Sequence, residues 1–195
     1  MFDNLRRDLR RALYGNQADE VGVVSLLREL WSPGTQAIIC YRFGRWSDRQ
    51  FGPIRVVLRV VHFVLQYFFS WRVGIRIPIG ADIGPGIVIH NWGGGIVLPS
   101  ARIGRDLTIV AGGVLMDHDV KEIGDCVWIG GGTKVVGKVR IGHRVRTGPN
   151  SVIQTDVPDD MLAFGNPARM IRNVAGFRSA VETAKKPPPS STEAS

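Results

Sequence analysis

Residues 87–99 read IVIHNWGGGIVLP and place a histidine, an asparagine and a tryptophan directly before three glycines. The β-branched residues on both sides favour strands, whereas Gly93 to Gly95 indicate backbone that turns sharply or approaches another group closely. A histidine titrates near neutral pH, so His90 could accept a proton from a reacting group. The glycines would let the backbone come close to whatever binds there.

A second histidine lies in a similarly irregular segment, MDHDVKE at 116–122. Here His118 stands between Asp117 and Asp119 and could serve as a charged or hydrogen-bonding partner. The other two histidines suggest no chemistry, because His62 lies in an apolar stretch and His143 at a regular turn, where we expect a packing and an exposed residue respectively. Four scattered histidines do not supply the three protein ligands of a catalytic zinc ion, so no metal site is expected.

The two histidine segments interrupt a regular repeat. From Ile77 onward aliphatic residues recur every six positions, often followed by glycine, and a small or branched residue stands four positions after them. The repeat positions are Ile77, Ile83, Ile89, Ile103, Ile109, Leu115, Ile123, Ile129, Val135, Ile141, Thr147 and Ile153. This period fits neither an α-helix nor a β-meander and predicts the stacked six-residue rungs of a β-helix. The repeat is broken only between Ile89 and Ile103 and between Leu115 and Ile123, where insertions of a solenoid commonly bind ligands.

Residues 1–73 have helical patterning instead. Leu5, Leu9 and Leu13 form one apolar stripe on a basic helix that should end near Gly15, and a break at 32–34 precedes a second helical stretch. The segment 53–74 approaches the length of a membrane span, but charged residues interrupt its first half, so we expect a buried or interfacial helix. We therefore predict a helical region over 1–73, a β-helix over 74–172 and a polar, proline-rich tail over 173–195.

The chain has 195 residues and a formal charge of +8, with arginine concentrated in the first third. A solvated helical face explains this charge most simply; a phosphate-bearing cofactor or an anionic membrane surface are the alternatives, and membrane-surface association is not the expectation. Nucleic acid is disfavoured because no binding motif accompanies the charge. With two cysteines and no signal-peptide pattern at its start, the chain is expected in the cytoplasm.

Two further motifs bring a family to mind. Tyr41, Arg42 and Trp46 follow a proline-glycine turn, and the repeats close on a Gly-x-Pro-Ala-Arg signature at 165–169. Over residues 2–172 the chain resembles the serine O-acetyltransferase family of hexapeptide acyltransferases, in its shorter form. The resemblance implies a mainly β fold, a left-handed parallel β-helix preceded by a small α-helical region. It further implies a homotrimer with acetyl-CoA as co-substrate, bound along the edge between neighbouring β-helices.

In that family a histidine before a Gly-Ile-Val sequence is the general base and a carboxylate from a preceding rung orients it. Counting without gaps from Ile77 places the base position on Asn91, whereas anchoring on the run Gly93–Val97 with a one-residue shift either brings His90 to it or leaves Trp92 beside it. The carboxylate position falls on Arg76, a departure from the family pattern. The resemblance therefore makes His90 and His118 the catalytic candidates, and a separate set the substrate-binding candidates: Asn91, Trp92 and Asp117.

The family's CoA contacts fall on the later rungs, between Ile123 and Ile153. They map to Gly131, Arg146 and Pro149, with Lys134 as a candidate for the phosphate groups. We accordingly expect an acetyl-CoA-dependent O-acetyltransferase acting on serine or a serine-like small molecule. Two alternatives stay open, transfer to a sugar hydroxyl and a non-catalytic scaffold that retained only the β-helix.

Overall fold

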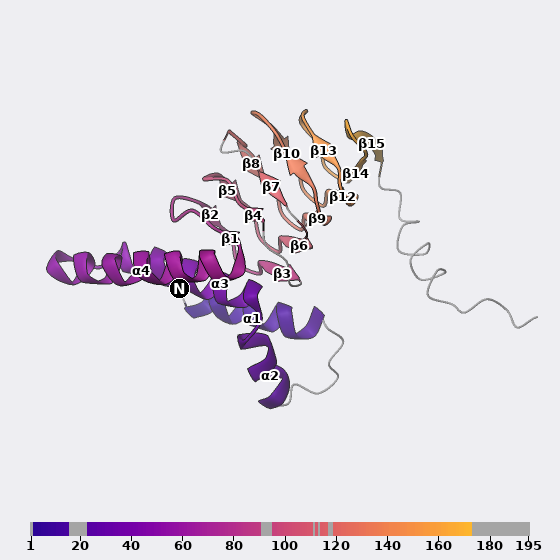
Figure 1. Ribbon diagram of the computed structural model, residues 1–195. Helices are drawn as coiled ribbons and strands as arrows, with labels where there is room; N and C mark the ends of the chain where they lie inside the picture. The colour runs from indigo at the N-terminus through magenta and orange to yellow at the C-terminus, as the bar shows by residue number, and fades with distance from the viewer. Residues whose placement is uncertain are drawn as a thin grey trace, which may run out of the picture.

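The computed structural model describes residues 2–15, 23–90, 95–110, 112, 114–116 and 119–172. Four helices lie at one end of a stack of short strands (Figure 1). The helices are α1 (Phe2–Gly15), α2 (Val23–Leu30), α3 (Pro33–Ser47) and α4 (Gly52–Val73). As predicted, α1 ends at Gly15. The break expected at 32–34 lies at residues 31–32, because α3 begins at Pro33, and proline suits the first turn of a helix but not its interior.

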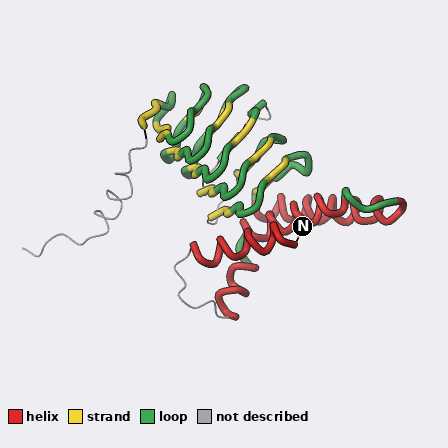
Figure 2. Tube along the Cα trace, turned by 180° about the vertical axis from the view of Figure 1, so that it is seen from behind, coloured by secondary structure: helices red, strands yellow, loops and turns green. Residues whose placement is uncertain are grey.

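The strands form three mostly parallel sheets, and up to β13 neighbouring strands of a sheet are three positions apart along the chain. Sheet A contains β1 (Ile75–Arg76), β4 (Ile96–Val97), β7 (Leu115–Met116), β10 (Lys134–Val135) and β13 (Val152–Ile153). Sheet B contains β2 (Asp82–Ile83), β5 (Arg102–Ile103), β8 (Glu122–Ile123) and β11 (Arg140–Ile141). Sheet C contains β3 (Val88–His90), β6 (Thr108–Val110), β9 (Trp128–Ile129), β12 (Arg146–Thr147), β14 (Met161–Phe164) and β15 (Arg169–Arg172), the last antiparallel to β14. The chain thus winds as a three-sided parallel β-helix whose rungs are seen edge-on in Figure 2.

The core consists of three columns of inward side chains, one for each sheet. Ile83, Ile103, Ile123 and Ile141 form the column of sheet B, and Ile89, Ile109, Ile129, Thr147 and Ala163 that of sheet C; all are buried. In sheet A the column is Ile77, Leu98, Met116, Val135 and Ile153. The six-residue repeat therefore predicted the whole column of sheet B, that of sheet C except Ala163, and Ile77, Val135 and Ile153 of sheet A.

The repeat is wrong at one rung. It expected Leu115 in the inward position, but the ladder pairs Met116 with Val135, and Met116 is the buried residue. Val114, two positions earlier, is also completely buried, as strand alternation requires. Seven positions separate Ile109 from Met116, one more than in the repeat, so this rung lies one position further along the chain.

The glycines that follow the repeat residues of sheet B stand directly above one another. A Cβ atom at Gly84, Gly104 or Gly124 would lie 2.6–2.8 Å from backbone atoms of the next rung. The rungs stack so closely at this corner that only glycine fits there. This explains the recurrent Ile-Gly pairs of the sequence.

The helices are fixed to the first rung by a buried polar network. Arg42 of α3 donates from Nε to Oδ2 of Asp8 in α1 at 2.9 Å, and its other nitrogens donate to the carbonyl oxygens of Ile83 and Gly84. Oδ1 of Asp8 accepts from the backbone amides of Gly86 and Ile87. Burial raises the pKa of Asp8, whereas the Arg42 guanidinium and these amides oppose the rise.

Of the two alternatives expected for helix α4, buried or interfacial, the structure contradicts the first. The helix packs against α3 and β1 along one side only and leaves most of its apolar side chains exposed. His62 is the exception, since it is buried against Gly44 of α3 and beside the ring of Phe43, which confirms it as a packing residue.

Candidate active site

His90 is the last residue of β3, at the point where the chain leaves sheet C for sheet A. Its neighbour Ile89 lies against the first turn of α3, where a Cβ on Gly34 would overlap the carbonyl oxygen of Ile89. The helical region therefore packs against the rung that carries His90, and the His90 side chain is half-buried. A glycine at position 34 is what allows this close approach.

The surroundings of His90 favour its neutral form. Loss of hydration lowers the pKa of the imidazole below the ordinary value of 6.5, and the positive charge of Arg11 lowers it further. The carboxylate of Glu29 in α2 acts in the opposite direction. Glu29 itself accepts a hydrogen bond of 2.7 Å from the hydroxyl of Thr35, which holds the carboxylate in place. A neutral imidazole at neutral pH is the form that can accept a proton.

An aromatic and a cationic side chain continue upward from His90 on the outer face of sheet C. The rings of His90 and Trp128 have centroids 6.3 Å apart, and the Arg146 guanidinium lies 5.7 Å from the centre of the Trp128 ring. Helix α1 covers the lower rungs of this face, where Arg11 donates to the hydroxyl of Thr108. Trp128, above α1, is 38% exposed. An open ring next to a guanidinium can bind a planar or anionic group.

Gly131 and Pro149 lie on the same corner of the prism, where the chain passes from sheet C to sheet A; we call its described residues the C–A edge: 95, 112, 114, 130–133 and 148–151. The amide of Asn150, next to Pro149, donates to the carbonyl oxygen of Gly131 at 2.8 Å, so these two corners are stacked. Arg146 precedes this edge on sheet C and Lys134 follows it on sheet A. The structure thus brings His90, Gly131, Pro149 and their two flanking cations to one edge.

Four of the predicted site residues, Asn91, Trp92, Asp117 and His118, lie outside the described residues. The strands that precede these residues show where the two interruptions of the repeat begin. The first follows β3 of sheet C, at the C–A edge, and the second follows β7 of sheet A, before the chain enters sheet B. Within one chain, the two histidine segments therefore begin at different corners of the prism.

Arg76, the residue at the family's carboxylate position, lies exposed on β1 beside Val97 in sheet A. Among the described contacts none joins it to His90. The carboxylate that influences His90 is instead that of Glu29, from the helical region. Sequence reasoning missed both Glu29 and Trp128, because neither stands in a segment that departs from its local pattern.

His143 is exposed, as predicted; its Nδ1 accepts the amide of Asp125 at 3.0 Å. In the described part of the chain, no three His, Cys, Asp or Glu side chains gather in a way that could hold a metal ion.

Comparisons with known proteins support the resemblance seen in the sequence. Residues 121–155 match the family described as "Bacterial transferase hexapeptide (six repeats)". The serine acetyltransferase of Synechococcus elongatus is 33% identical over 188 residues, which cover 93% of this chain and 71% of that protein. The chain belongs to the serine acetyltransferase family.

Solved structures extend this relationship to the helices. A serine acetyltransferase in complex with CoA superimposes with a TM-score of 0.69 at 27% identity, over 87% of this chain and 68% of that one. A soybean serine acetyltransferase complexed with serine gives the same TM-score and coverage at 28% identity. Family membership therefore includes the helical region as well as the β-helix.

Proposed function

We propose that this chain transfers the acetyl group of acetyl-CoA to the hydroxyl of serine, with His90 as the general base. The family is one of acyltransferases, and acetyl-CoA is its acetyl donor. The observation that carries the proposal is the position of His90 on the C–A edge, in a chain whose family relatives were solved with CoA and with serine.

In the proposed reaction, the serine hydroxyl oxygen attacks the thioester carbonyl carbon while the neutral imidazole of His90 takes the hydroxyl proton. The C–O bond forms, the tetrahedral intermediate collapses and the C–S bond breaks. The imidazolium then returns the proton to the departing sulfur, so that free CoA and the O-acetyl ester are released. Glu29 stabilises the imidazolium electrostatically during this cycle.

CoA would lie along the C–A edge, above His90. Arg146 and Lys134 supply positive charge on its two sides for the phosphate groups, and the Trp128 ring offers a surface for a planar group. Gly131 and Pro149 would contact the cofactor at the corner itself. The cofactor then reaches the imidazole from the upper rungs.

We further propose a homotrimer as the working unit. If His90 and His118 serve one acceptor, the two corners from which their segments begin must come from different chains, since they are different corners of one prism. A symmetric trimer would close three such sites. Sedimentation that shows a stable monomer at micromolar concentration would contradict this assembly.

The activity is tested by following thiol release from acetyl-CoA with serine, homoserine and a sugar acceptor in parallel. His90→Ala should lower turnover by about 10²–10⁴, the usual share of general base catalysis, with binding of acetyl-CoA almost unchanged. His118→Ala should act on the apparent constant for the acceptor, if it positions substrate. His143→Ala is the matched control, because this exposed histidine lies at another corner.

If His118→Ala abolishes turnover and His90→Ala retains activity, the general base is in the second interruption of the repeat and the assignment of His90 is wrong. A sugar acceptor is the second candidate, favoured by Arg76 at the position of the family's carboxylate. Thiol release with the sugar alone would select it. If no acceptor releases CoA, the scaffold alternative holds.

A further inference from the structure

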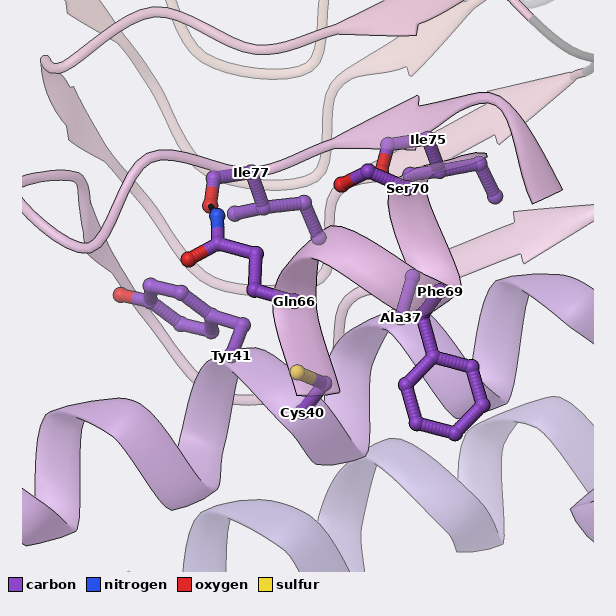
Figure 3. A pocket seen from close by; sticks show the side chains of 8 residues that line it. All are labelled: Ala37, Cys40, Tyr41, Gln66, Phe69, Ser70, Ile75 and Ile77. Carbon is purple, nitrogen blue, oxygen red and sulfur yellow. Dashed lines mark hydrogen bonds between the residues drawn. The ribbon is translucent and has the colours of Figure 1, made fainter. Parts of the chain in front are cut away.

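Helix α4 turns a polar face toward the protein and an apolar face toward the solvent, the reverse of a helix that packs on the core of a water-soluble domain. Its polar side chains His62, Gln66 and Ser70 face the protein: Gln66 donates to the carbonyl oxygen of Ile77 at 3.0 Å and Ser70 to that of Ile75 at 3.3 Å. Figure 3 shows these two side chains pointing from α4 toward β1 and the residues that follow it. An amphipathic helix that packs on a core normally has the opposite arrangement.

The opposite side of α4 is apolar and exposed. Its exposed large apolar residues are Ile54, Val56, Val57, Val60, Val61, Phe63, Val64, Leu65, Tyr67, Phe68 and Trp71. At 100° per residue they sweep about 200° of the helix circumference. We call these residues the α4 arc. Val64 and Trp71, near its centre, are 59% and 82% exposed. An exposed apolar surface of this extent marks an interaction site.

The charges around the arc identify its partner. Residues 1–73 contain eleven arginines and no lysine against six acidic residues, which gives +5 of the chain's net charge of +8. Arg72 ends the helix at the border of the arc, and Arg55 and Arg59 stand near its beginning. A second copy of the chain would bring the same positive charges to the contact and be repelled, whereas anionic lipid headgroups would neutralise them.

The aromatic residues point to the same partner. Tyr67 and Trp71 end the arc, and Trp31, which follows α2, is linked to this end: Gln36 donates to the carbonyl oxygen of Trp31 and accepts from Arg72. Trp31 is itself 70% exposed. Tryptophan and tyrosine beside arginine are the residues that occupy the headgroup level of a bilayer.

We propose that α4 lies in the plane of a membrane surface that contains anionic lipids, with the α4 arc in the acyl region. By length and composition Gly52–Arg72 could also cross a bilayer. Spanning would, however, break the hydrogen bonds of Gln66 and Ser70 and the ion pair of Arg59 with Asp48, whose atoms are 2.9 Å apart. An in-plane helix keeps these contacts and buries only its free side.

The inference is independent of the acetyltransferase activity and is tested by flotation of the full chain with extruded vesicles. We expect the protein to float with phosphatidylcholine vesicles containing 30% phosphatidylglycerol, and less with phosphatidylcholine alone. The double variant V64E/W71E should lower the bound fraction at least tenfold. The matched control is F164E/I171E, which places two charges on exposed apolar residues of β14 and β15 and should bind like the wild type.

Quenching provides a second readout that does not depend on the fold of the double variant. Brominated phosphatidylcholine in the anionic vesicles should quench the tryptophan fluorescence of the wild type, and Trp71→Phe should remove most of this quenching. Absence of flotation with anionic vesicles would overturn the proposal. So would unchanged flotation of V64E/W71E, or a double variant that alters only the sedimentation coefficient of the free protein, since the arc would then bind a second copy.

Discussion

Arg42 and Asp8 form an ion pair that is almost completely removed from water, with Nε and Oδ2 2.9 Å apart. The pair joins α3 to α1, and through the amides of Gly86 and Ile87 it joins both helices to the first turn of the β-helix. Tyr41 adds a parallel link, because its hydroxyl donates to the carbonyl oxygen of Ala81 and accepts the amide of Ile83. Since α3 also contacts Ile89, this junction fixes the helices that enclose His90.

Asp8→Asn should destabilise the chain by about 3–5 kcal/mol, because it leaves the Arg42 guanidinium buried without its counter-charge. Urea or thermal unfolding at one fixed protein concentration measures this loss. Asp82→Asn is the control: it removes the exposed partner of Arg45 and should cost less than about 1 kcal/mol. Equal costs for the two substitutions would contradict the role assigned to the buried pair.

Gly124→Ala should also destabilise the protein, by about 1–3 kcal/mol or more, because the added Cβ would lie 2.6 Å from the backbone of Gly142 on the next rung. At Gly80 the same change meets nothing closer than the Ser100 hydroxyl at 3.7 Å. Gly80→Ala should therefore leave the unfolding midpoint almost unchanged. A tolerated Gly124→Ala would show that the rungs are less closely stacked at this corner than the structure indicates.

The sequence was most informative where structure repeats. Six-residue spacing predicted the inward columns of the β-helix, because every rung places the same kind of residue against the same neighbours. It failed at Met116, since an extra residue between two rungs changes register without changing composition. It also left open whether α4 is buried or interfacial, because an apolar helix has the same pattern whether protein or lipid covers it.

The site was only partly predictable for a related reason. His90 stands out because it lies where the repeat is broken, and Gly131 and Pro149 were carried over from the family resemblance; all three lie along one edge. Glu29 and Trp128 reach His90 from α2 and from β9, and no local pattern marks a residue whose partner is tens of positions away. The part played by Glu29 depends on how the helical region docks, which the repeat does not encode.

The fall of kcat/KM at acidic pH, the acid limb of its pH profile, should reflect the lowered pKa of His90. Burial favours the neutral imidazole, so kcat/KM should hold as the pH falls and decline only below the ordinary histidine value of 6.5. Glu29→Gln removes the opposing carboxylate and should move the limb to still lower pH, whereas Arg11→Met should move it upward. An acid limb above pH 6.5 that neither substitution moves would show that a different group titrates.

Arg146→Ala should raise the apparent constant for acetyl-CoA about tenfold and change kcat little. Its guanidinium lies 5.7 Å from the centre of the exposed Trp128 ring, on the rungs above His90, and a charged hydrogen bond to a phosphate contributes about 1.5–3 kcal/mol. Arg140→Ala is the matched control, because it removes the same charge from sheet B, away from the C–A edge. Saturation curves for acetyl-CoA at low and moderate salt separate local contact from overall charge. If both variants shift the constant equally, and salt abolishes the shift, the positive charge acts through the general field of the protein and Arg146 does not hold the cofactor.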